Sequence, residues 1–385
     1  MNETFFAPCP RGLEAPLADE LRELGAHDVA AADAGVSFSG DFALCYRVNL
    51  QSRIASRILW SIDTWEYKTE DDVYEGVKGL PWDKCFTVSK TIAVTVNAVK
   101  CPLRSLDFIT LLIKDAVCDR FRDLCSERPS VETHNPDVRI HAFLNATHVT
   151  LYLDTSGEAL FKRGLRVSSG DAPLKENLAA GILRMANWKP GIPLVDPMCG
   201  SGTFLLQAAQ IALDIAPGLN RPFGFANLLN FDEKSYAQIH EELIARCKPV
   251  TKLPIYGSDL YGEALDDAKA NLQAAGLTDA VQLKQANVLE ISPPAESGIM
   301  VMNPPYGVRL GEQRDLAEFY PKLGDVLKQK FSGWNAYILS ADMRLPKLIH
   351  LAASKRTPLF NGKLECRLFE YKMVAGTMRR PVAAE

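Results

Sequence analysis

The sequence predicts an α/β protein whose second half forms a doubly wound, mainly parallel sheet, with a smaller α+β module in front of it. Two observations predict this fold. From about residue 190 onward, apolar strand-like runs alternate with helix-like runs, which is the order that produces parallel sheets with right-handed crossovers. A glycine-rich turn also separates the first of these strands from the first helix, as in folds that bind ligands at the carboxyl ends of their strands.

The glycine-rich turn is the segment 196–203, Asp-Pro-Met-Cys-Gly-Ser-Gly-Thr, between an apolar strand at 192–195 and a helix-like run at 204–212. Glycines let the backbone approach a ligand with no Cβ in the way, and the start of a helix offers unpaired N–H groups. The segment lacks the Gly-Lys-Ser/Thr of a phosphate-binding P-loop and the third glycine of the dinucleotide motif. A purely structural turn is the alternative interpretation.

A second motif, Asn303-Pro304-Pro305-Tyr306, follows the apolar run 299–302, which is typical of a buried parallel strand. The prolines remove two backbone donors, and their carbonyl oxygens remain acceptors. The Asn303 amide can accept and donate, and Tyr306 offers a flat ring. These residues suit the binding of a planar amino group: the oxygens can accept hydrogen bonds from its two N–H groups, and the attached heterocycle can stack on the Tyr306 ring. A turn without catalytic function would use the same residues.

Together the two motifs, about a hundred residues apart, resemble those of class I S-adenosylmethionine-dependent methyltransferases with an Asn-Pro-Pro-Tyr motif, which methylate planar amino or amide nitrogens. The resemblance implies S-adenosyl-L-methionine as cofactor and S-adenosylhomocysteine as product. It implies catalytic roles for Asn303, Pro304 and Tyr306, with Tyr306 also binding substrate. It implies cofactor contacts for Asp196, Met198, Gly200, Gly202, Thr203, Asp259, Leu260, Asn287, Val288 and Asn303.

Within that set, Asp259 ends the predicted strand 254–259 and would hold the ribose hydroxyls of the cofactor. Asn287 follows the strand-like run 281–284, at a position where the family usually has an aspartate beside the adenine. Asparagine keeps the shape of that side chain but can present either an oxygen or an N–H₂ group.

The remainder of the second half continues the alternation and predicts helices at 262–275, 316–331 and 345–353 and strands at 334–340 and 364–371. Gly276 stops the first of these helices. The resemblance implies that the last strand inserts antiparallel. The segment 217–231, rich in Gly, Pro and Asn, is a predicted loop that could be a lid, a substrate contact or a plain surface insertion.

The front of the chain predicts short mixed elements: helices at 18–24 and 108–121, and strands at 36–40, 91–96, 138–143 and 149–153. The segment 44–59 is amphipathic and rich in arginine. Such a mixture is typical of a small α+β module. It resembles a THUMP domain with a ferredoxin-like segment before it, as found in RNA-modifying enzymes, most strongly over 105–166.

The link that follows, 154–166 with 172–176, resembles that of RlmL-type ribosomal RNA guanine-N2 methyltransferases. The expected division is a ferredoxin-like segment at 1–44, a THUMP domain at 45–155, a linker at 156–190 and a methyltransferase domain at 191–385. Some relatives carry a second methyltransferase domain, which is expected to be absent because this chain stops soon after Arg380. At the linker we expect Arg163, Arg166 and Lys175 to contact RNA phosphates.

Composition limits the classes of function. The net charge is −4, with 16 Lys/Arg against 23 Asp/Glu through Asp154 and 27 against 24 beyond it, so affinity for RNA must come from local basic patches. No run of about twenty apolar residues indicates a membrane span, and the start does not read as a signal peptide. The nine scattered cysteines are typical of reduced thiols in the cytoplasm, and the six histidines show no metal-binding spacing.

The sequence therefore predicts an RNA guanine-N2 methyltransferase, cytoplasmic and by default monomeric, acting on large-subunit (23S) ribosomal RNA without a metal or a membrane. Transfer RNA as substrate is an alternative that these residues do not separate. Methylation of adenine N6 in DNA or of a protein glutamine amide is a further alternative, because those nitrogens are planar and delocalised in the same way. A non-catalytic RNA-binding assembly factor is the alternative from another class.

Overall fold

The structure is a computed structural model that describes residues 2–164, 174–305 and 310–374, with the side chains of 310–315 left out. The chain forms two compact units, and neither is one continuous segment. Unit 1 comprises residues 1–9, 14–163 and 216–246, and unit 2 comprises residues 10–13, 164–215 and 247–385. The expected four-part division at residues 44, 155 and 190 stays a prediction.

Unit 2 is built on a seven-stranded sheet in the order β10-β9-β8-β11-β12-β14-β13. The strands β8 to β12 pair in parallel, whereas β14 lies antiparallel to both β12 and β13. The predicted parallel sheet and the antiparallel last strand are thus confirmed. The strands are β8 (Leu194–Asp196), β9 (Ile255–Asp259), β10 (Gln282–Gln285), β11 (Gly298–Met302), β12 (Trp334–Ser340), β13 (Lys355–Asn361) and β14 (Leu364–Lys372).

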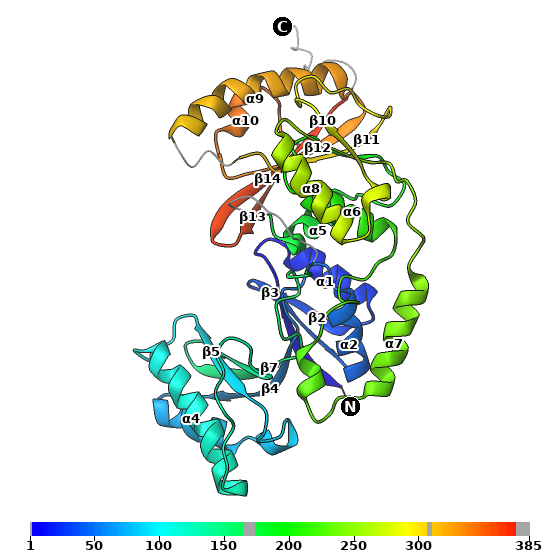
Figure 1. The fold of residues 1–385 in the computed structure, drawn as a ribbon. Coiled ribbons are helices and arrows are strands. Elements are labelled where there is room, and N and C mark those ends of the chain that lie inside the picture. Colours follow the sequence, from blue (N-terminus) through cyan, green and yellow to red (C-terminus); the bar gives the residue numbers. More distant parts are fainter. Residues whose placement is uncertain (1, 165–173, 306–309, 375–385) are drawn as a thin grey trace. The chain divides into compact units, whose positions relative to one another are not determined.

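Helices cover both faces of this sheet, as Figure 1 shows, with α9 and α10 on one face and α5, α6 and α8 on the other. On the first face Tyr320, Leu323 and Leu327 of α9 pack with Met300 and Ile338 of the central strands in one buried cluster. Strands buried on both faces need continuous apolar runs. The helices are α5 (Glu176–Met185), α6 (Thr203–Ala212), α8 (Gly262–Ala274), α9 (Leu310–Lys330) and α10 (Leu345–Leu348).

One prediction for this region was wrong, and one strand was not predicted. The helix expected at 345–353 is only the four-residue α10, because His350 takes a left-handed backbone (φ 55°) and the chain turns toward β13. The strand β13 was missed altogether. It pairs along its whole length with β14 and lies at the edge of the sheet, where a proline such as Pro358 needs no ladder partner and half-exposed side chains blur the alternation that marks a strand.

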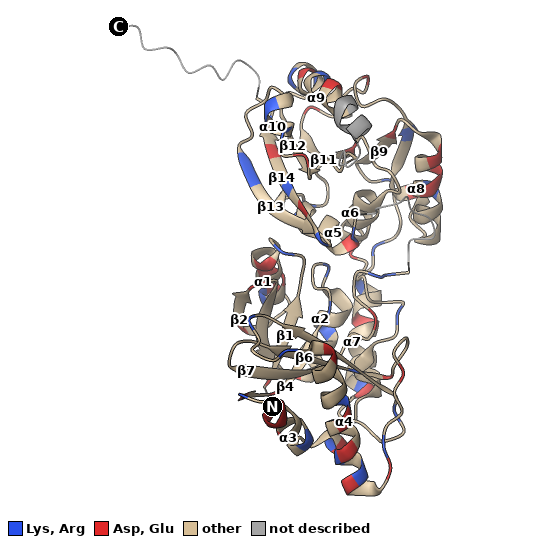
Figure 2. Ribbon diagram, turned by 90° about the vertical axis from the view of Figure 1, so that its left-hand side faces the viewer, with Lys and Arg blue, Asp and Glu red and all other residues tan. Residues whose placement is uncertain are grey.

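Charge is unevenly distributed over unit 2. Figure 2 shows acidic positions on α8 and basic positions on α10 and β13, at the other end of the sheet. Between residues 344 and 372 there are seven basic and two acidic side chains, namely Arg344, Lys347, Lys355, Arg356, Lys363, Arg367 and Lys372 against Glu365 and Glu370. This end of the sheet therefore carries an excess of positive charge among the described residues.

Unit 1 also contains a seven-stranded sheet, in the order β2-β3-β1-β4-β7-β6-β5. Its strands are β1 (Glu3–Pro8), β2 (His27–Ala32), β3 (Gly35–Gly40), β4 (Leu59–Glu66), β5 (Ile92–Ala98), β6 (Val138–Leu144) and β7 (His148–Asp154). Its helices are α1 (Glu14–Glu23), α2 (Phe42–Gln51), α3 (Glu70–Gly79), α4 (Leu106–Cys125) and α7 (Glu233–Arg246). The mixed α+β class predicted for the front of the chain is confirmed.

The segment 216–246, which interrupts the second half of the sequence, belongs to unit 1. It contains a 3₁₀ turn at Gly224–Asn227 and α7, which packs on α2. Tyr46 of α2 is fully buried; its ring centroid lies 4.8 Å from that of Phe225, and its hydroxyl accepts a hydrogen bond from the N–H of Asp232 at 2.9 Å. The predicted loop at 217–231 is thus an integral part of the core of unit 1.

Conversely, the short segment 10–13 belongs to unit 2, although the residues on both sides of it in the sequence belong to unit 1. Gly12 has φ 91°, and a Cβ there would lie 2.3 Å from the carbonyl oxygen of Pro358. Leu13 is fully buried and packs so closely on Gly181 of α5 that a Cβ at Gly181 would meet Leu13 Cδ1 at 2.4 Å. Within the described residues, no helix is long and apolar enough to cross a membrane.

Candidate active site

The turn after β8 is shaped by two glycines in the left-handed region, Gly200 (φ 52°) and Gly202 (φ 80°). The Gly202 N–H donates to the Cys199 carbonyl at 2.8 Å, and a Cβ on Gly202 would stand 3.2 Å from that of Ala268 on α8. A Cβ on Gly200 would meet nothing within 4 Å. Gly202 therefore serves the packing of α8, whereas Gly200 leaves room for a ligand to approach the backbone.

Asp259, at the carboxyl end of β9, is bonded to this turn. Its Oδ2 accepts the Gly200 N–H at 3.0 Å, and its Oδ1 accepts the Tyr261 N–H at 3.1 Å. Its side chain is buried except for a small edge, with the residue 9% exposed. Each carboxylate oxygen has a further lone pair, so Asp259 can hold the turn and still accept hydrogen bonds from ligand hydroxyls.

Asp196, at the end of β8, is 2% exposed, and its Oδ1 accepts only a long hydrogen bond from the Met198 N–H, at 3.3 Å. Burial, with a smaller contribution from the like charge of Asp259, raises the pKa of Asp196 well above its usual range, against the lowering effect of the Met198 N–H. Among the described residues, no lysine or arginine forms an ion pair with Asp196. A cationic ligand would supply the missing compensation, and the ammonium of a methionine moiety has that charge.

The third strand end carries Asn287, whose Oδ1 accepts the Leu289 N–H at 3.0 Å and whose carbonyl accepts the Glu290 N–H at 2.9 Å. The side-chain oxygen of Asn287 thus stabilises the turn that contains Asn287. Asn287 is half-buried, and Val288 is 5% exposed. These residues follow β10, the neighbour of β9, so the ends of β8, β9 and β10 form one continuous edge that carries the predicted cofactor residues.

Asn303 lies on the same edge. It follows β11, which pairs with β8 through Met300 and Val195, so the end of β11 stands beside Asp196. Asn303 is half-buried, Pro304 buried and Pro305 exposed. The structure therefore brings the start of the Asn-Pro-Pro-Tyr motif next to the glycine-rich turn, although about a hundred residues separate them in the sequence.

The other predicted cofactor residues differ in exposure. Met198 is half-buried, Thr203 is 6% exposed, and Leu260 is 52% exposed. Leu260 thus offers an apolar surface next to Asp259. Tyr306 and Arg166 lie outside the described residues.

Two predicted phosphate contacts, Arg163 and Lys175, are placed differently. Arg163 is 7% exposed, and its Nη2 donates to the Arg53 carbonyl at 2.9 Å, which favours a structural role in unit 1. Lys175 is half-buried at the start of α5. Its Nζ lies 4.0 Å from the position that a Cβ on Gly362 would occupy, at the turn between β13 and β14.

Two residues that are bonded to the predicted cofactor residues or to the glycine-rich turn were not predicted from the sequence. Tyr261 is 71% exposed, and its N–H donates to Asp259. Asn271 of α8 is fully buried, and its Nδ2 donates to the carbonyl of Ser201 at 3.0 Å. Tyr261 could have been suspected from its place beside Asp259. Asn271 left no local signal, because its partner lies 70 residues away in the sequence.

A cavity of about 310 Å³ opens beside the same strands but is not the predicted cofactor site. Val195, Ser258 and Ala286 line it, and each directly precedes one of Asp196, Asp259 and Asn287. Because successive strand residues point to opposite faces, the cavity lies against the other face of the strands. The segment between β10 and β11 contains no helix to cover that face.

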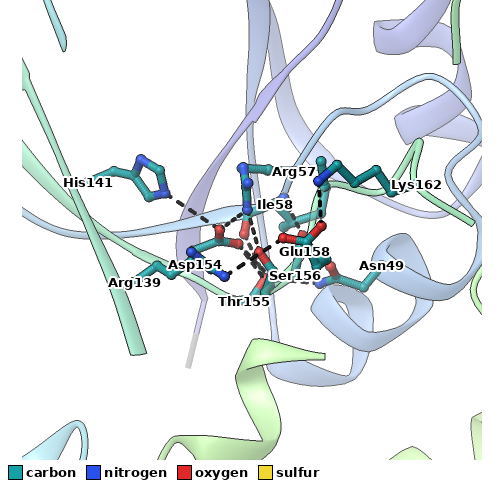
Figure 3. Close-up of polar contacts among 12 residues, drawn as sticks. Asn49, Arg57, Ile58, Arg139, His141, Asp154, Thr155, Ser156, Glu158 and Lys162 are labelled. Atoms are coloured by element: carbon teal, nitrogen blue, oxygen red, sulfur yellow. Dashed lines mark hydrogen bonds and ion pairs between the residues drawn. The ribbon is translucent and has the colours of Figure 1, made fainter. Parts of the chain in front are cut away.

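A second polar cluster, in unit 1, surrounds the buried carboxylate of Asp154 at the end of β7 (Figure 3). Asp154 accepts from Arg57 and from the Ser156 N–H at 2.8 Å, and His141 Nε2 lies 3.5 Å from its Oδ2. In the same cluster Lys162 pairs with Glu158 at 2.9 Å. These contacts order the chain where it leaves β7, which makes this cluster structural.

Among the described residues, Cys199 is the cysteine of the glycine-rich turn, and its surroundings do not favour nucleophilic chemistry. Cys199 is buried, and burial, with the charges of Asp196 and Asp259, raises the pKa of its thiol far above the usual range. A thiol that stays protonated is a poor nucleophile. Within the same described ranges, no group of three or more His, Cys, Asp or Glu side chains could hold a metal ion.

Comparison with known protein families gives three matches in sequence order. Residues 4–59 match the RlmL ferredoxin-like domain, residues 67–154 the THUMP domain, and residues 163–370 the RMKL-like methyltransferase domain. These three descriptions follow one another along most of the chain.

Individual proteins are similar over nearly the whole chain. The protein slr0064 of Synechocystis, whose name proposes RNA methyltransferase activity, is 40% identical over 96% of both chains. The ribosomal RNA large subunit methyltransferase K/L of Shewanella frigidimarina is 40% identical over 98% of this chain, which spans 54% of that relative's length. The crystal structure of SMU.472, proposed as a methyltransferase and complexed with S-adenosylhomocysteine, is 30% identical, with a TM-score of 0.89 over 98% of this chain and 99% of that one.

Proposed function

This chain belongs to the RMKL-like methyltransferase family, and from that membership we propose that it methylates the exocyclic N2 of a guanine in RNA, most specifically in large-subunit ribosomal RNA. S-adenosyl-L-methionine is its methyl donor. RNA as the substrate is supported by the THUMP match and by the names of the relatives. We place the reaction in the cytoplasm.

One observation carries the proposal: the acceptor motif begins at the strand end beside the donor turn. β11 pairs with β8, so Asn303 and Pro304 emerge next to Asp196 and the Gly200 turn. Methyl transfer needs the attacking nitrogen, the methyl carbon and the sulfur in line. Two neighbouring strand ends, one presenting the donor and the other the acceptor, suit that requirement.

The chain's own residues would act by binding and orientation. When bound, S-adenosylmethionine supplies a methyl group already activated by its sulfonium. Asp196 and Gly200 would hold the methionine part and Asp259 the ribose hydroxyls. The Asn303 side-chain oxygen and the Pro304 carbonyl oxygen would each accept a hydrogen bond from one N–H of the guanine N2 amino group. They would also stabilise the positive charge that develops on N2. Transfer would replace the S–C bond of the donor with an N–C bond, and one N–H proton would then leave to water.

Guanine N2 is a poor nucleophile because its lone pair is delocalised into the ring. Acceptors set off the plane of the base favour a pyramidal nitrogen with a directed lone pair, and Tyr306 would stack on the base. A guanine paired in a helix hides this nitrogen, so the substrate guanine must be unpaired or flipped out. Lys175, whose Nζ lies near the turn between β13 and β14, would contact a phosphate of the substrate RNA.

A transfer assay with labelled donor tests the proposal. The purified protein is incubated with ribosomal RNA, transfer RNA, DNA and total protein from a strain that lacks it, and the product is digested and identified. We expect label in N2-methylguanosine from large-subunit ribosomal RNA. Label in N2-methylguanosine of transfer RNA would show that transfer RNA, and not ribosomal RNA, is the substrate. Label in N6-methyladenine of DNA or in protein glutamine would refute guanine-N2 transfer.

The role of Asn303 is tested separately with Asn303→Ala. We expect at least a hundredfold loss of turnover, which is the usual effect of removing one stabilising group of this kind, with donor affinity nearly unchanged by calorimetry. Asn230→Ala, an exposed asparagine in unit 1, is the matched control. Near-normal turnover by Asn303→Ala would show that this amide does not hold the acceptor nitrogen.

A further inference from the structure

The loop between β10 and β11, residues 286–297, begins beside two predicted donor contacts. The Ala286 N–H donates to the carbonyl of Asp259 at 3.0 Å. Gln285, at the end of β10, donates from its Nε2 to the carbonyl of Leu260, also at 3.0 Å. These two hydrogen bonds place the start of the β10–β11 loop next to the end of β9, where the ribose of the donor is expected.

The sheet supports this loop only in part. Val288 is buried in the same apolar cluster as Leu327 of α9. Ser292 and Pro294, in contrast, are exposed, and together with Ile291 they border the cavity of about 310 Å³. Because a void withholds packing contacts from the residues around it, contacts from outside the strands have more weight in holding this loop.

Lys330, the last residue of α9, supplies such contacts. Its Nζ lies 3.4 Å from the carbonyl oxygen of Leu289 and 3.3 Å from those of Glu290 and Ile291. An ammonium group carries three N–H donors, so each of these consecutive carbonyls can receive one. Among the described residues, no other hydrogen bond reaches the three oxygens. The loop therefore depends on Lys330 to satisfy this set of acceptors.

The same turn is bonded to Asn287 from its other side. Asn287 Oδ1 accepts the Leu289 N–H at 3.0 Å, and the Asn287 carbonyl accepts the Glu290 N–H at 2.9 Å. Leu289 and Glu290 thus use their N–H groups toward Asn287 and their carbonyls toward Lys330. This double use links the position of Asn287 to the end of α9.

The far end of the loop has a separate anchor. Trp334 is 1% exposed, and its Nε1 donates to the carbonyl of Ala295 at 3.1 Å. A Cβ on Gly298 would lie only 2.6 Å from the Trp334 ring. Gly298 begins β11, so this anchor lies at the end of the sheet away from the predicted donor residues. Lys330 is the contact that acts on the donor side of the loop.

We propose that Lys330 is a positioning residue for the methyl donor: its ammonium holds residues 289–291, and through them Asn287 and Val288, where they receive the adenine of S-adenosylmethionine. This inference rests on the donor binding that is part of the proposed function, and it adds the residue that fixes the adenine side of the site. Lys330 acts through the loop and does not itself contact the donor.

Calorimetry of S-adenosylhomocysteine binding to the full-length protein tests the proposal. Lys330→Met keeps the length and the apolar stem of the side chain but removes its charge and its donors. It should raise the Kd by about tenfold, a typical effect of a residue that acts on a site through its neighbours. Lys330→Arg keeps the charge and offers N–H donors, so it should restore most of the affinity. An unchanged Kd in Lys330→Met, or an equal loss in Lys330→Arg, would overturn the proposal.

Hydrogen exchange followed by mass spectrometry reports on the loop itself. In the wild type, S-adenosylhomocysteine should slow exchange in the peptide that contains residues 287–291. In the donor-free protein, Lys330→Met should speed exchange of that peptide and leave peptides from β12 unchanged. No protection of the loop by the ligand in the wild type would exclude the loop from the donor site and refute the proposal. Faster exchange throughout unit 2 would show general destabilisation and refute it as well.

A neighbouring lysine on the same helix provides the matched control. Lys328 lies 4.0 Å from Asp325, and its side chain is 45% exposed. Lys328→Met should leave both the Kd and the exchange of the loop unchanged, and a loss equal to that of Lys330→Met would indicate a general effect of charge and refute the proposal.

Neither readout requires RNA. A protein that binds S-adenosylhomocysteine as described but does not methylate guanine would therefore refute guanine-N2 transfer and leave the role of Lys330 standing. A wild-type protein that does not bind S-adenosylhomocysteine would refute both.

Discussion

The backbone N–H of Gly200 donates to Asp259 Oδ2 across 3.0 Å, which joins the turn after β8 to the end of β9. The same carboxylate accepts the N–H of Tyr261, so one side chain holds both loops that are expected to contact the donor. These two hydrogen bonds restrict the loops relative to each other, which lowers the entropy cost of binding a ligand there.

The two turn glycines should respond differently to a methyl group. Gly200→Ala places its Cβ in open space, so we expect the protein to lose only about 1 kcal/mol of stability, from the left-handed backbone, but to lose most donor binding. Gly202→Ala adds a tight contact with Ala268 at 3.2 Å and should destabilise the fold more. Urea unfolding and donor calorimetry measure the two effects. The idea fails if Gly200→Ala binds the donor normally.

The raised pKa of Asp196 predicts a pH dependence. Folding raises this pKa, so the folded protein holds a proton where the unfolded chain has released it. The stability of the donor-free protein should therefore fall as pH rises from about 4, the ordinary value, to the raised value, and this contribution should be constant above it.

Asp196→Asn should remove that slope and weaken donor binding by about 1.5–3 kcal/mol, because a charge-assisted hydrogen bond is lost. Urea titrations between pH 4 and 8 and calorimetry give both quantities. Asp279→Asn, at an exposed position, controls for the loss of one charge. An unchanged slope in Asp196→Asn would assign the pH dependence to another group.

Thiol reactivity should follow burial. Cys199 and Cys45 are buried, and burial raises the pKa of Cys45 to about 12 and that of Cys199 further. Cys125 is exposed at the end of α4. Iodoacetamide at pH 8 should therefore modify Cys125 and leave the two buried thiols intact, as read by peptide mass spectrometry. Rapid modification of Cys199 in the folded protein would contradict its inert role.

The insertion 216–246 should be held to unit 1 mainly by Tyr46. Tyr46→Phe keeps the ring contacts with Phe225 but leaves the Asp232 N–H without its acceptor, so it should cost about 1 kcal/mol. Tyr46→Ala also empties a buried site and should cost about 3–5 kcal/mol. Urea unfolding provides both values. Equal stability of the two variants would mean that the hydroxyl, not the ring, carries the interaction.

Much of the catalytic half could be predicted from local pattern. The run that became β11 is apolar throughout, β12 has an apolar centre at 336–339, and Gly276 marks the end of α8, so each element could be assigned from a few neighbouring residues. The edge strand β13 could not, because half-exposed side chains and Pro358 conceal its alternation. Its identity as a strand depends on pairing with β14.

The candidate site likewise contains residues that could be proposed from the sequence and contacts that could not. The glycines, Asp259 and Asn303 were proposed from motifs, and their placement at one end of the strands follows from the order of parallel strands. The contact of Asn271 with Ser201 and the pairing of Arg344 with Asp342 were not predicted. Such contacts depend on the directions of individual side chains, which periodicity does not specify.

The sequence by itself determined the order of strands and helices around residues 192–212 and 299–302 and the chemistry available there, because backbone preference and apolar pattern act over a few residues. Only the tertiary structure decided that residues 216–246 complete unit 1 while residues 10–13 complete unit 2, and that Asp196 is buried with a raised pKa. These properties arise from contacts between segments far apart in the chain, where burial and packing outweigh local preference.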